Sequence, residues 1–318
     1  MDVRKSGANP GVGLVLAAAV LWGTVGPAQV LASSPMTPAA LGGWRLVAGG
    51  LVLAVCTVRP RRLRAFATRS MVRPLLICAF STGLYQAAFL SSVARTGAAL
   101  ATVVALGIAP AATGVCARWL TGERMGAAWL AGTVAAVAGC ALLLAPGNTR
   151  VDPFGLLLAV AAGFCYGLYT VFAKRTADAH PAAHLPTLSA LTLLVGSLPL
   201  LPWMLGDLAP VRDGGTLALI GWLGVATTAV AYWLFTAGLS RVRATTAGTL
   251  SLAEPLAAAL IGVFLLDERL TPSAWAGCAL ILAGMIITCL PPLPRRRSTA
   301  PTPGTVAPPD RDRHEVRA

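Results

Sequence analysis

Residues 253–269 read AEPLAAALIGVFLLDER, an apolar stretch with a glutamate and a proline near its start and a charged turn at its end. Residues 108–124, which lie 145 positions earlier, read IAPAATGVCARWLTGER and carry the proline and the final Glu-Arg pair in the same register. Each stretch lies in an apolar run of about 20 residues, the length that a helix needs to cross a bilayer. The two stretches therefore predict a duplicated membrane helix.

The composition of the whole chain excludes a water-soluble globular protein. Of the 318 residues, 56% are hydrophobic and only 12% are charged, whereas an ordinary soluble domain is about a quarter charged. Such a chain cannot supply a polar surface of the usual extent. The net charge of +13 does not indicate a nucleic-acid partner, because the basic residues lie between long apolar stretches. This pattern favours a lipid bilayer as the partner.

Ten apolar runs are long enough to span a membrane as helices. They cover residues 11–31, 39–58, 74–93, 97–117, 126–145, 153–173, 185–205, 216–237, 244–266 and 272–291. Only Arg45 and Glu254 are charged within them. We therefore expect an all-α membrane protein with ten transmembrane helices. The first run follows two basic residues, as a signal peptide would, but its length favours a retained helix.

The basic residues are divided unevenly between alternate loops. The loops on one side, with the N-terminus and the start of the tail, carry 17 Lys and Arg residues, and the other loops carry only Arg95, Arg150, Arg212 and Arg269. Because positively charged loops remain in the cytoplasm, we expect both termini to be cytoplasmic in a plasma-membrane protein. Residues 292–318 have no apolar face, and we expect them to form a disordered cytoplasmic tail.

An internal repeat divides the chain into two halves. At a shift of 145 residues, Pro110 aligns with Pro255, and Glu123-Arg124 aligns with Glu268-Arg269. The two predicted five-helix repeats cover residues 11–145 and 153–291. Because five crossings is an odd number, the second half enters the membrane from the opposite side. Inverted repeats are typical of secondary transporters, and the alternative is a duplication retained for stability alone.

Several of these segments carry a resemblance to a known family. The first run contains Trp22-Gly23, the second contains Trp44-Arg45-Leu46, and the ninth contains Ala253-Glu254-Pro255. Together with the ten runs, the duplication and the two Glu-Arg turns, they make residues 11–291 resemble the EamA-type drug/metabolite transporter family. One departure is Ala109, because the family often has a glutamate before the fourth-run proline. Glu254 is then the one remaining carboxylate of this kind.

The resemblance implies a secondary transporter that exports small organic metabolites, such as amino acids or drugs, through the plasma membrane by alternating access. Its partners would be a small solute, the lipid bilayer and protons. The alternatives are an intramembrane enzyme acting on a lipid, which would need clustered catalytic side chains, and a membrane sensor. We find no hydrolase motif, P-loop or strong metal motif, and His180 and His184 alone are a weak signal. We therefore expect no enzyme activity, catalytic residue, cofactor or metal.

Glu254 and Arg45 are the charged candidates for the transport site. A carboxylate near the middle of a span is unfavourable unless it is paired, neutralised or hydrated. Glu254 would therefore couple protons or bind a substrate amine, or it would be a capped carboxylate at a helix break made by Pro255. Pro110 marks the corresponding predicted break in the first half. Arg45 would clamp an anionic group, pair with Glu254 or extend to the outer interface.

Aromatic and amide side chains at membrane depth complete the candidate site. A cavity for an organic solute needs aromatic walls and a few polar anchors. The candidates are Trp22, Gln29, Tyr85, Gln86, Tyr166, Tyr169, Tyr232 and Trp233. Packing between helices is the alternative role for each. Glycines seven residues apart in runs five and ten predict close helix contacts, either between the subunits of a homodimer or within one chain.

Overall fold

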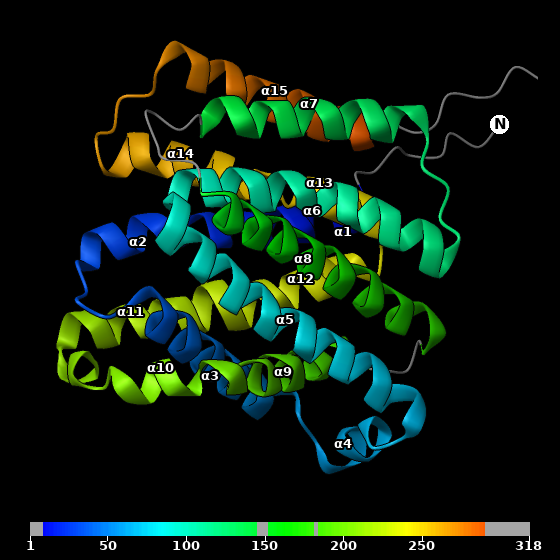
Figure 1. The fold of residues 1–318 in the computed structure, drawn as a ribbon. Helices are drawn as coiled ribbons and strands as arrows, with labels where there is room; N and C mark the ends of the chain where they lie inside the picture. The colour runs from blue at the N-terminus through cyan, green and yellow to red at the C-terminus, as the bar shows by residue number, and fades with distance from the viewer. Residues whose placement is uncertain (1–8, 145–151, 181–183, 290–318) are drawn as a thin grey trace, which may run out of the picture.

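The computed structural model describes residues 9–144, 152–180 and 184–289. Within these ranges the secondary structure is helical, with no strand (Figure 1). The described part contains nine helical segments of at least 18 residues that are apolar enough to cross a membrane, and the shorter apolar helix Ala127–Leu143 is the tenth. The predicted all-α membrane fold with ten helices is therefore confirmed. The predicted tail, 292–318, lies outside the described residues.

The described part of the first half contains seven helices, one of which, α4, is a short helix after the second span. The elements are α1 (Pro10–Gly23), α2 (Val25–Ala32), α3 (Pro38–Thr57), α4 (Pro60–Phe66), α5 (Arg69–Thr96), α6 (Ala98–Thr121) and α7 (Ala127–Leu143). In Figure 1 the turn after α2 and the helix α4 lie at opposite ends of the bundle. We refer to these as the α2 end and the α4 end.

The second half is more often interrupted. Its elements are α8 (Pro153–Ala179), α9 (Leu185–Gly196), η1 (Leu198–Leu200), α10 (Leu201–Gly206), η2 (Ala209–Arg212), α11 (Gly214–Gly224), η3 (Val225–Val230), α12 (Ala231–Leu239), α13 (Ala244–Leu250), α14 (Ala253–Leu265) and α15 (Pro272–Cys289). The segment η3 is a π-helix between α11 and α12, so these three elements form one continuous span.

The two halves interlock through their first spans. Helix α8, the first span of the second half, packs against α5 and α6 of the first half. Helix α1, the first span of the first half, packs in the same way against α12 and α14 of the second half. The corresponding spans α3 and α9, and α7 and α15, also pack on each other. This reciprocal packing is the arrangement expected for two inverted five-helix repeats.

Glycine contacts repeat in the two halves at the spacing found in the sequence. A Cβ on Gly23 would lie 2.9 Å from the amide nitrogen of Ala258, and a Cβ on Gly167 would lie 2.6 Å from that of Thr113. Residues 23 and 167 are 144 positions apart, and residues 113 and 258 are 145 positions apart. These glycines therefore allow equivalent close helix crossings in both halves.

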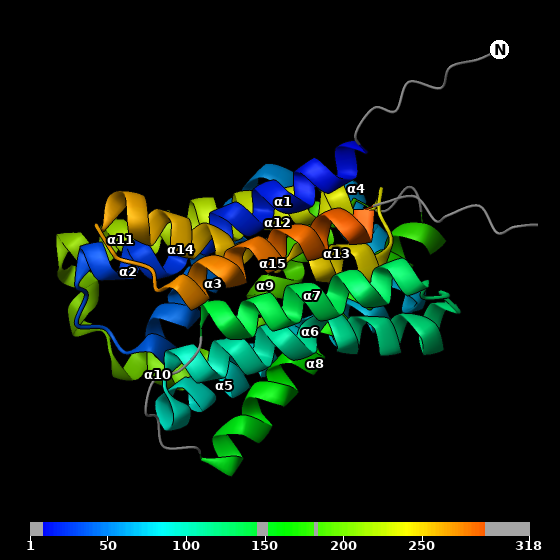
Figure 2. The ribbon, with the colours of Figure 1, turned by 90° about the horizontal axis from the view of Figure 1, so that it is seen from above.

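Helices α7 and α15 lie side by side and use the predicted glycine faces against each other (Figures 1 and 2). A Cβ on Gly139 would lie 2.6 Å from the carbonyl oxygen of Gly277, and a Cβ on Gly277 would lie 2.6 Å from that of Gly139. Gly132 and Gly284 form the second contact of this pair. The small-residue faces of the fifth and tenth spans are thus used within one chain.

The Glu-Arg turns have the same backbone in both halves. Gly122 and Asp267 precede the two glutamates and have positive φ angles of 69° and 53°. The amide of Glu123 donates to the carbonyl oxygen of Ala117 at 3.3 Å, and the amide of Glu268 donates to that of Gly262 at 3.0 Å. Because these turns follow α6 and α14, they lie at opposite ends of the bundle.

The prolines at the predicted breaks behave differently. In the ninth span, α13 ends at Leu250, α14 begins at Ala253, and Pro255 occupies the first turn of α14, where a proline is tolerated. In the fourth span, α6 continues past Pro110 without interruption, so the expected break there is wrong. One proline removes a single backbone hydrogen bond, and the close packing of α8 on α6 supports the helix at this level.

Candidate functional site

Five aromatic side chains meet between α1, α8 and α12, and we call them the central cluster. They are Trp22, Tyr166, Tyr169, Tyr232 and Phe235. The ring centroid of Trp22 lies 5.7 Å from that of Tyr232 and 5.3 Å from that of Phe235. The centroid of Tyr169 lies 5.9 Å from that of Tyr232. Four of the five aromatic residues were sequence candidates, and the fifth, Phe235, was not.

The central cluster forms because its aromatic residues are three positions apart on two helices. Tyr166 and Tyr169 share one face of α8, and Tyr232 and Phe235 share one face of α12. The rings of α12 contact Trp22 of α1 and also the two tyrosines of α8. The cluster therefore joins the first span of each half to the eighth span.

Ser251 connects the central cluster to the break in the ninth span. The hydroxyl groups of Tyr166 and Ser251 lie 2.5 Å apart, and the Ser251 hydroxyl also lies 2.8 Å from the carbonyl oxygen of Ala247. Ser251 directly follows α13, and Glu254 lies three residues later in the first turn of α14. The partial positive charge of a helix N-terminus favours a carboxylate at this position.

Glu254 and Arg45 face the same region without forming an ion pair. Glu254 interacts electrostatically with Arg45, Tyr85 and Tyr166, and Arg45 also interacts with Tyr85 and Tyr232. Both charged side chains are half-buried. Among the described residues, no nitrogen of Arg45 lies within 4.0 Å of a carboxylate oxygen of Glu254. Two opposite charges thus border the central cluster without a direct contact that would neutralise both.

The protein does not satisfy the hydrogen-bonding capacity of the Arg45 side chain at its Nε atom. Its Nε is buried and has no hydrogen-bond partner among the described residues, and the same is true of the indole nitrogen of Trp44. A buried donor without a partner is unfavourable, which makes such a group a reasonable point of contact for a ligand or a water molecule. The arginine therefore has hydrogen-bonding capacity left for an additional group.

Tyr85 and Gln86 lie at the α5 side of the site. The Tyr85 ring stacks on Phe89, with a centroid distance of 5.7 Å and an interplanar angle of 2°. Gln86 is buried against α3, where a Cβ on Gly42 would lie 3.0 Å from its Nε2. Tyr85 reaches Glu254 and Arg45 electrostatically, whereas Gln86 fills the contact between α3 and α5.

Two candidates lie away from the central cluster. Gln29 is exposed, and its Nε2 donates to the carbonyl oxygen of Val25 in its own helix at 3.2 Å. Trp233 is 49% exposed on the outer face of α12, although it directly follows Tyr232. Phe235 belongs to the central cluster and Ser251 contacts it, although neither was a sequence candidate. Their positions three residues after Tyr232 and three residues before Glu254 could have identified both in the sequence.

Side-chain contacts anchor α13 to α7 and to the turn that precedes α7. The hydroxyl groups of Thr133 and Thr249 lie 2.8 Å apart in a buried contact. The Arg243 Nε donates to a carboxylate oxygen of Glu123 at 2.9 Å, and the hydroxyl of Thr245 donates to the same oxygen. Glu123 is thus a structural carboxylate at the α4 end, and these contacts support the segment that leads to Ser251.

Two acidic residues at the α2 end, Asp213 and Asp152, are engaged in local contacts. The amide of Thr216 donates to Asp213 Oδ2 at 2.7 Å, and this backbone hydrogen bond lowers the pKa of Asp213. Asp152 forms an ion pair with Arg95 at 3.1 Å, and this interaction lowers the pKa of Asp152. Among the described residues, no three His, Cys, Asp or Glu side chains come together as a metal site would require.

Comparison with known proteins identifies the family of this chain. The model of the EamA-like transporter family matches residues 9–145 and, a second time, residues 153–290. The chain belongs to the EamA-like transporter family. It is 37% identical over 292 residues to the uncharacterized transporter YwfM of Bacillus subtilis, covering 90% of this chain and 95% of that protein.

Other relatives of this EamA-like transporter include a protein with a named solute. The threonine/homoserine exporter RhtA of Escherichia coli is 33% identical over 253 residues, covering 75% of this chain and 77% of that exporter. A solved crystal structure of a protein matches with a TM-score of 0.75 at 22% identity, covering 87% of this chain and 95% of that one. That likeness supports the fold alone.

The two halves of this EamA-like transporter differ at the carboxylate position. Glu254 corresponds to Ala109 at the shift of 145 residues, and Ala109 is buried, with 3% of its surface exposed. The corresponding crossing in the first half is closely packed, because Gly167 meets the backbone of residues 112 and 113. The carboxylate at this level is therefore supplied by the second half.

Proposed function

We propose that this EamA-like transporter exports a small zwitterionic metabolite of the amino-acid class across the plasma membrane. The observation that carries the proposal is the placement of Arg45 and Glu254 around one aromatic cluster without an ion pair between them. A solute with one positive and one negative group satisfies both charges at once. A solute with a single charge leaves the other side chain half-buried and unpaired, which is unfavourable.

The chemistry of each side chain fits one end of an amino acid. The guanidinium of Arg45 presents a planar set of donors that binds a carboxylate through two hydrogen bonds. Glu254 is the natural partner of the ammonium group, and the nearby tyrosine and tryptophan rings attract a cation through their faces. The relatives named threonine/homoserine exporters support this class of solute.

The inverted repeats supply the conformational change. Each first span packs on the third and fourth spans of the other half, so a small rotation of one half against the other repacks both sides of the site. The helix breaks at Thr24 and at residues 251–252 adjoin the central cluster and divide their spans into two segments. Broken helices at a midplane site between inverted repeats are typical of alternating access.

Glu254 also connects transport to protons in this proposal. A carboxylate that binds the solute ammonium in one step and a proton in the return step couples the two movements in opposite directions. We place the α4 end in the cytoplasm, because α4 and its neighbours carry a basic cluster that positively charged cytoplasmic loops typically have. The cluster contains Arg59, Arg61, Arg62, Arg64 and Arg69. The repeats in this proposal cover residues 11–145 and 153–291.

The test is the charge selectivity of transport. Purified protein in proteoliposomes is assayed with a panel of labelled amino acids and, for each transported amino acid, with its amine analogue lacking the carboxylate and its acid analogue lacking the ammonium group. We expect the amino acid to be transported at least tenfold faster than either analogue, which corresponds to about 1.4 kcal/mol. Equal transport of an amino acid and one of its analogues would contradict a two-charge site.

A further inference from the structure

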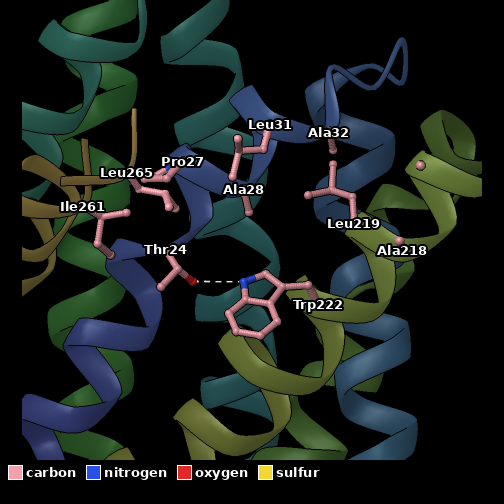
Figure 3. A pocket seen from close by; sticks show the side chains of 11 residues that line it. Thr24, Pro27, Ala28, Leu31, Ala32, Ala218, Leu219, Trp222, Ile261 and Leu265 are labelled. Atoms are coloured by element: carbon pink, nitrogen blue, oxygen red, sulfur yellow. Dashed lines mark hydrogen bonds between the residues drawn. The ribbon is translucent and has the colours of Figure 1, made fainter. Parts of the chain in front are cut away.

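A second, apolar site lies outside the central cluster, at the α2 end of the bundle. A groove of about 580 Å³ lies between α2, α11 and α14. Its lining includes Thr24, Leu31, Ala218, Trp222 and Leu265. Figure 3 shows these side chains arranged around an open space between the three helices. The central cluster contributes no residue to this lining.

The groove has no polar side chain, among the described residues, without a hydrogen-bond partner. Its polar side chains are those of Thr24 and Trp222, and Figure 3 shows the hydrogen bond that joins them. The indole nitrogen of Trp222 donates to the Thr24 hydroxyl oxygen at 3.1 Å, and the Thr24 hydroxyl donates to the carbonyl oxygen of Leu21 at 2.7 Å. A polar occupant would find no partner here, so the groove favours an apolar one.

The groove opens toward the surface that the lipid covers. Leu31 and Leu265 on its rim are each 62% exposed, and Trp222 is 47% exposed. These residues belong to membrane-spanning segments, so the solvent that they meet is the hydrocarbon of the bilayer. The groove follows α2 from Thr24 to Ala32, a rise of about 12 Å at 1.5 Å per residue. An elongated apolar chain that runs along the span matches this shape.

The charges at this end do not favour one head group. Arg212 and Arg269 lie near the groove, at the start of the eighth span and after the ninth. Each of them neighbours acidic residues in the sequence, Asp213 in one case and Asp267 with Glu268 in the other. The end is therefore not a basic patch of the kind that selects anionic lipids. Recognition rests on the groove itself.

We propose that the groove binds one acyl chain of a bilayer phospholipid, independently of the charge of its head group. The chain lies between α2 of the first repeat and α11 and α14 of the second, and it covers the outer side of the α1–α2 break. Gly23, beside Thr24, packs on α14, where a Cβ would lie 2.8 Å from the carbonyl oxygen of Glu254. The bound chain thus supports the helix contact behind the proposed solute site.

The test uses fluorescence quenching by phospholipids with brominated acyl chains. A few lipids per protein are added to the full chain in detergent, and the quenching of tryptophan emission is measured. Trp222→Phe removes the tryptophan in the groove, and Trp275→Phe is the matched control, because Trp275 is 48% exposed on α15, outside the groove. We expect Trp222→Phe to lose more quenching than Trp275→Phe, and this larger loss defines the part of the quenching that depends on Trp222.

Filling the groove gives an independent readout that keeps Trp222. Ala218→Phe places a ring in the groove, and Ala138→Phe makes the same change at an exposed position of α7. We expect at least a threefold loss of the Trp222-dependent quenching in Ala218→Phe only, with equal results for phosphatidylcholine and phosphatidylglycerol of the same chains. Equal losses in both tryptophan variants, or unchanged quenching in Ala218→Phe, would overturn the proposal.

Two other outcomes would assign the groove differently. Quenching by phosphatidylglycerol but not by phosphatidylcholine would show recognition of a head group and overturn the assignment to the acyl chain. A dimer of the wild-type protein by light scattering that is lost in Ala218→Phe would assign the groove to a second copy of this chain. None of these measurements depends on solute transport. They therefore test lipid binding in the groove independently of the proposed function.

Discussion

The Tyr166 hydroxyl lies 2.5 Å from that of Ser251, and this contact joins the aromatic cluster to the break in the ninth span. Ser251 lies three residues before Glu254. The position of the carboxylate relative to the rings therefore depends on α8 as well as on its own span. A side chain on one helix thus positions a charged group on another.

Tyr166→Phe removes this hydrogen bond and keeps the ring. We expect a two- to tenfold higher KM for the solute, because one hydrogen bond contributes about 0.5–1.5 kcal/mol. Ser251 keeps its contact with Ala247, so the thermal stability should change little. The measurement is the concentration dependence of transport in proteoliposomes. Tyr169→Phe is the matched control, because its hydroxyl lies 3.4 Å from that of Ser189, and an equal or larger effect there would contradict the assignment.

Gly277→Ala tests the contact between α7 and α15. The added methyl group would lie 2.6 Å from the carbonyl oxygen of Gly139, so the helices must separate. We expect the free energy of unfolding to fall by about 1–3 kcal/mol, as for other overpacked sites. Gly221→Ala on α11 is the control, because a Cβ there has no neighbour within 4 Å. Equal thermal unfolding of the two variants in detergent would show that α7 and α15 do not pack this closely.

Glu123→Gln and Glu268→Gln make the same change at corresponding positions of the two repeats. Glu123 is bound by Arg243 and Thr245, whereas Glu268 forms no ion pair with any described residue. We expect Glu123→Gln to lower the free energy of unfolding by about 1.5–3 kcal/mol, the range for hydrogen bonds to a charged group. Glu268→Gln should stay within about 0.5 kcal/mol. Thermal unfolding of the pair measures the difference, and a larger loss in Glu268→Gln would refute it.

Asp213→Asn tests how the stability of the fold depends on pH in the acidic range. The amide of Thr216 lowers the pKa of Asp213 in the folded protein. The carboxylate therefore stabilises the fold above the unfolded pKa of about 3.9, and this contribution is lost as the pH falls through the lower folded pKa. We expect the wild type to be more stable than Asp213→Asn at pH 6 and the difference to disappear at strongly acidic pH. Melting temperatures that differ by the same amount at every pH would argue against this linkage.

The lengths of the apolar runs were sufficient to predict the ten spans, because a helix must be about 20 residues long to cross the bilayer. The spacing of Gly132, Gly139, Gly277 and Gly284 also predicted a close helix contact, since glycine lets backbones approach each other. The continuity of α6 through Pro110 was not predictable in this way. Whether a proline interrupts a helix depends on its neighbours, and α8 packs against α6.

Only part of the candidate site could be predicted from the sequence. Tyr166 and Tyr169 share a helix face by their spacing, and both lie in the central cluster. Gln29 and Trp233 instead lie outside it, because lipid and protein interior are both apolar and the sequence does not show which side of a span faces the centre. Phe235 was missed as well, although its position three residues after Tyr232 places it on the same face of α12.

The most direct test of the central claim is solute transport by Glu254→Gln in proteoliposomes, with Glu268→Gln as the control at the end of the same span. If Glu254 binds the ammonium group and couples the proton, Glu254→Gln should lose at least tenfold in kcat/KM together with the pH dependence of transport, while Glu268→Gln keeps both. Transport by Glu254→Gln at the wild-type rate, with an unchanged pH profile, would contradict the account.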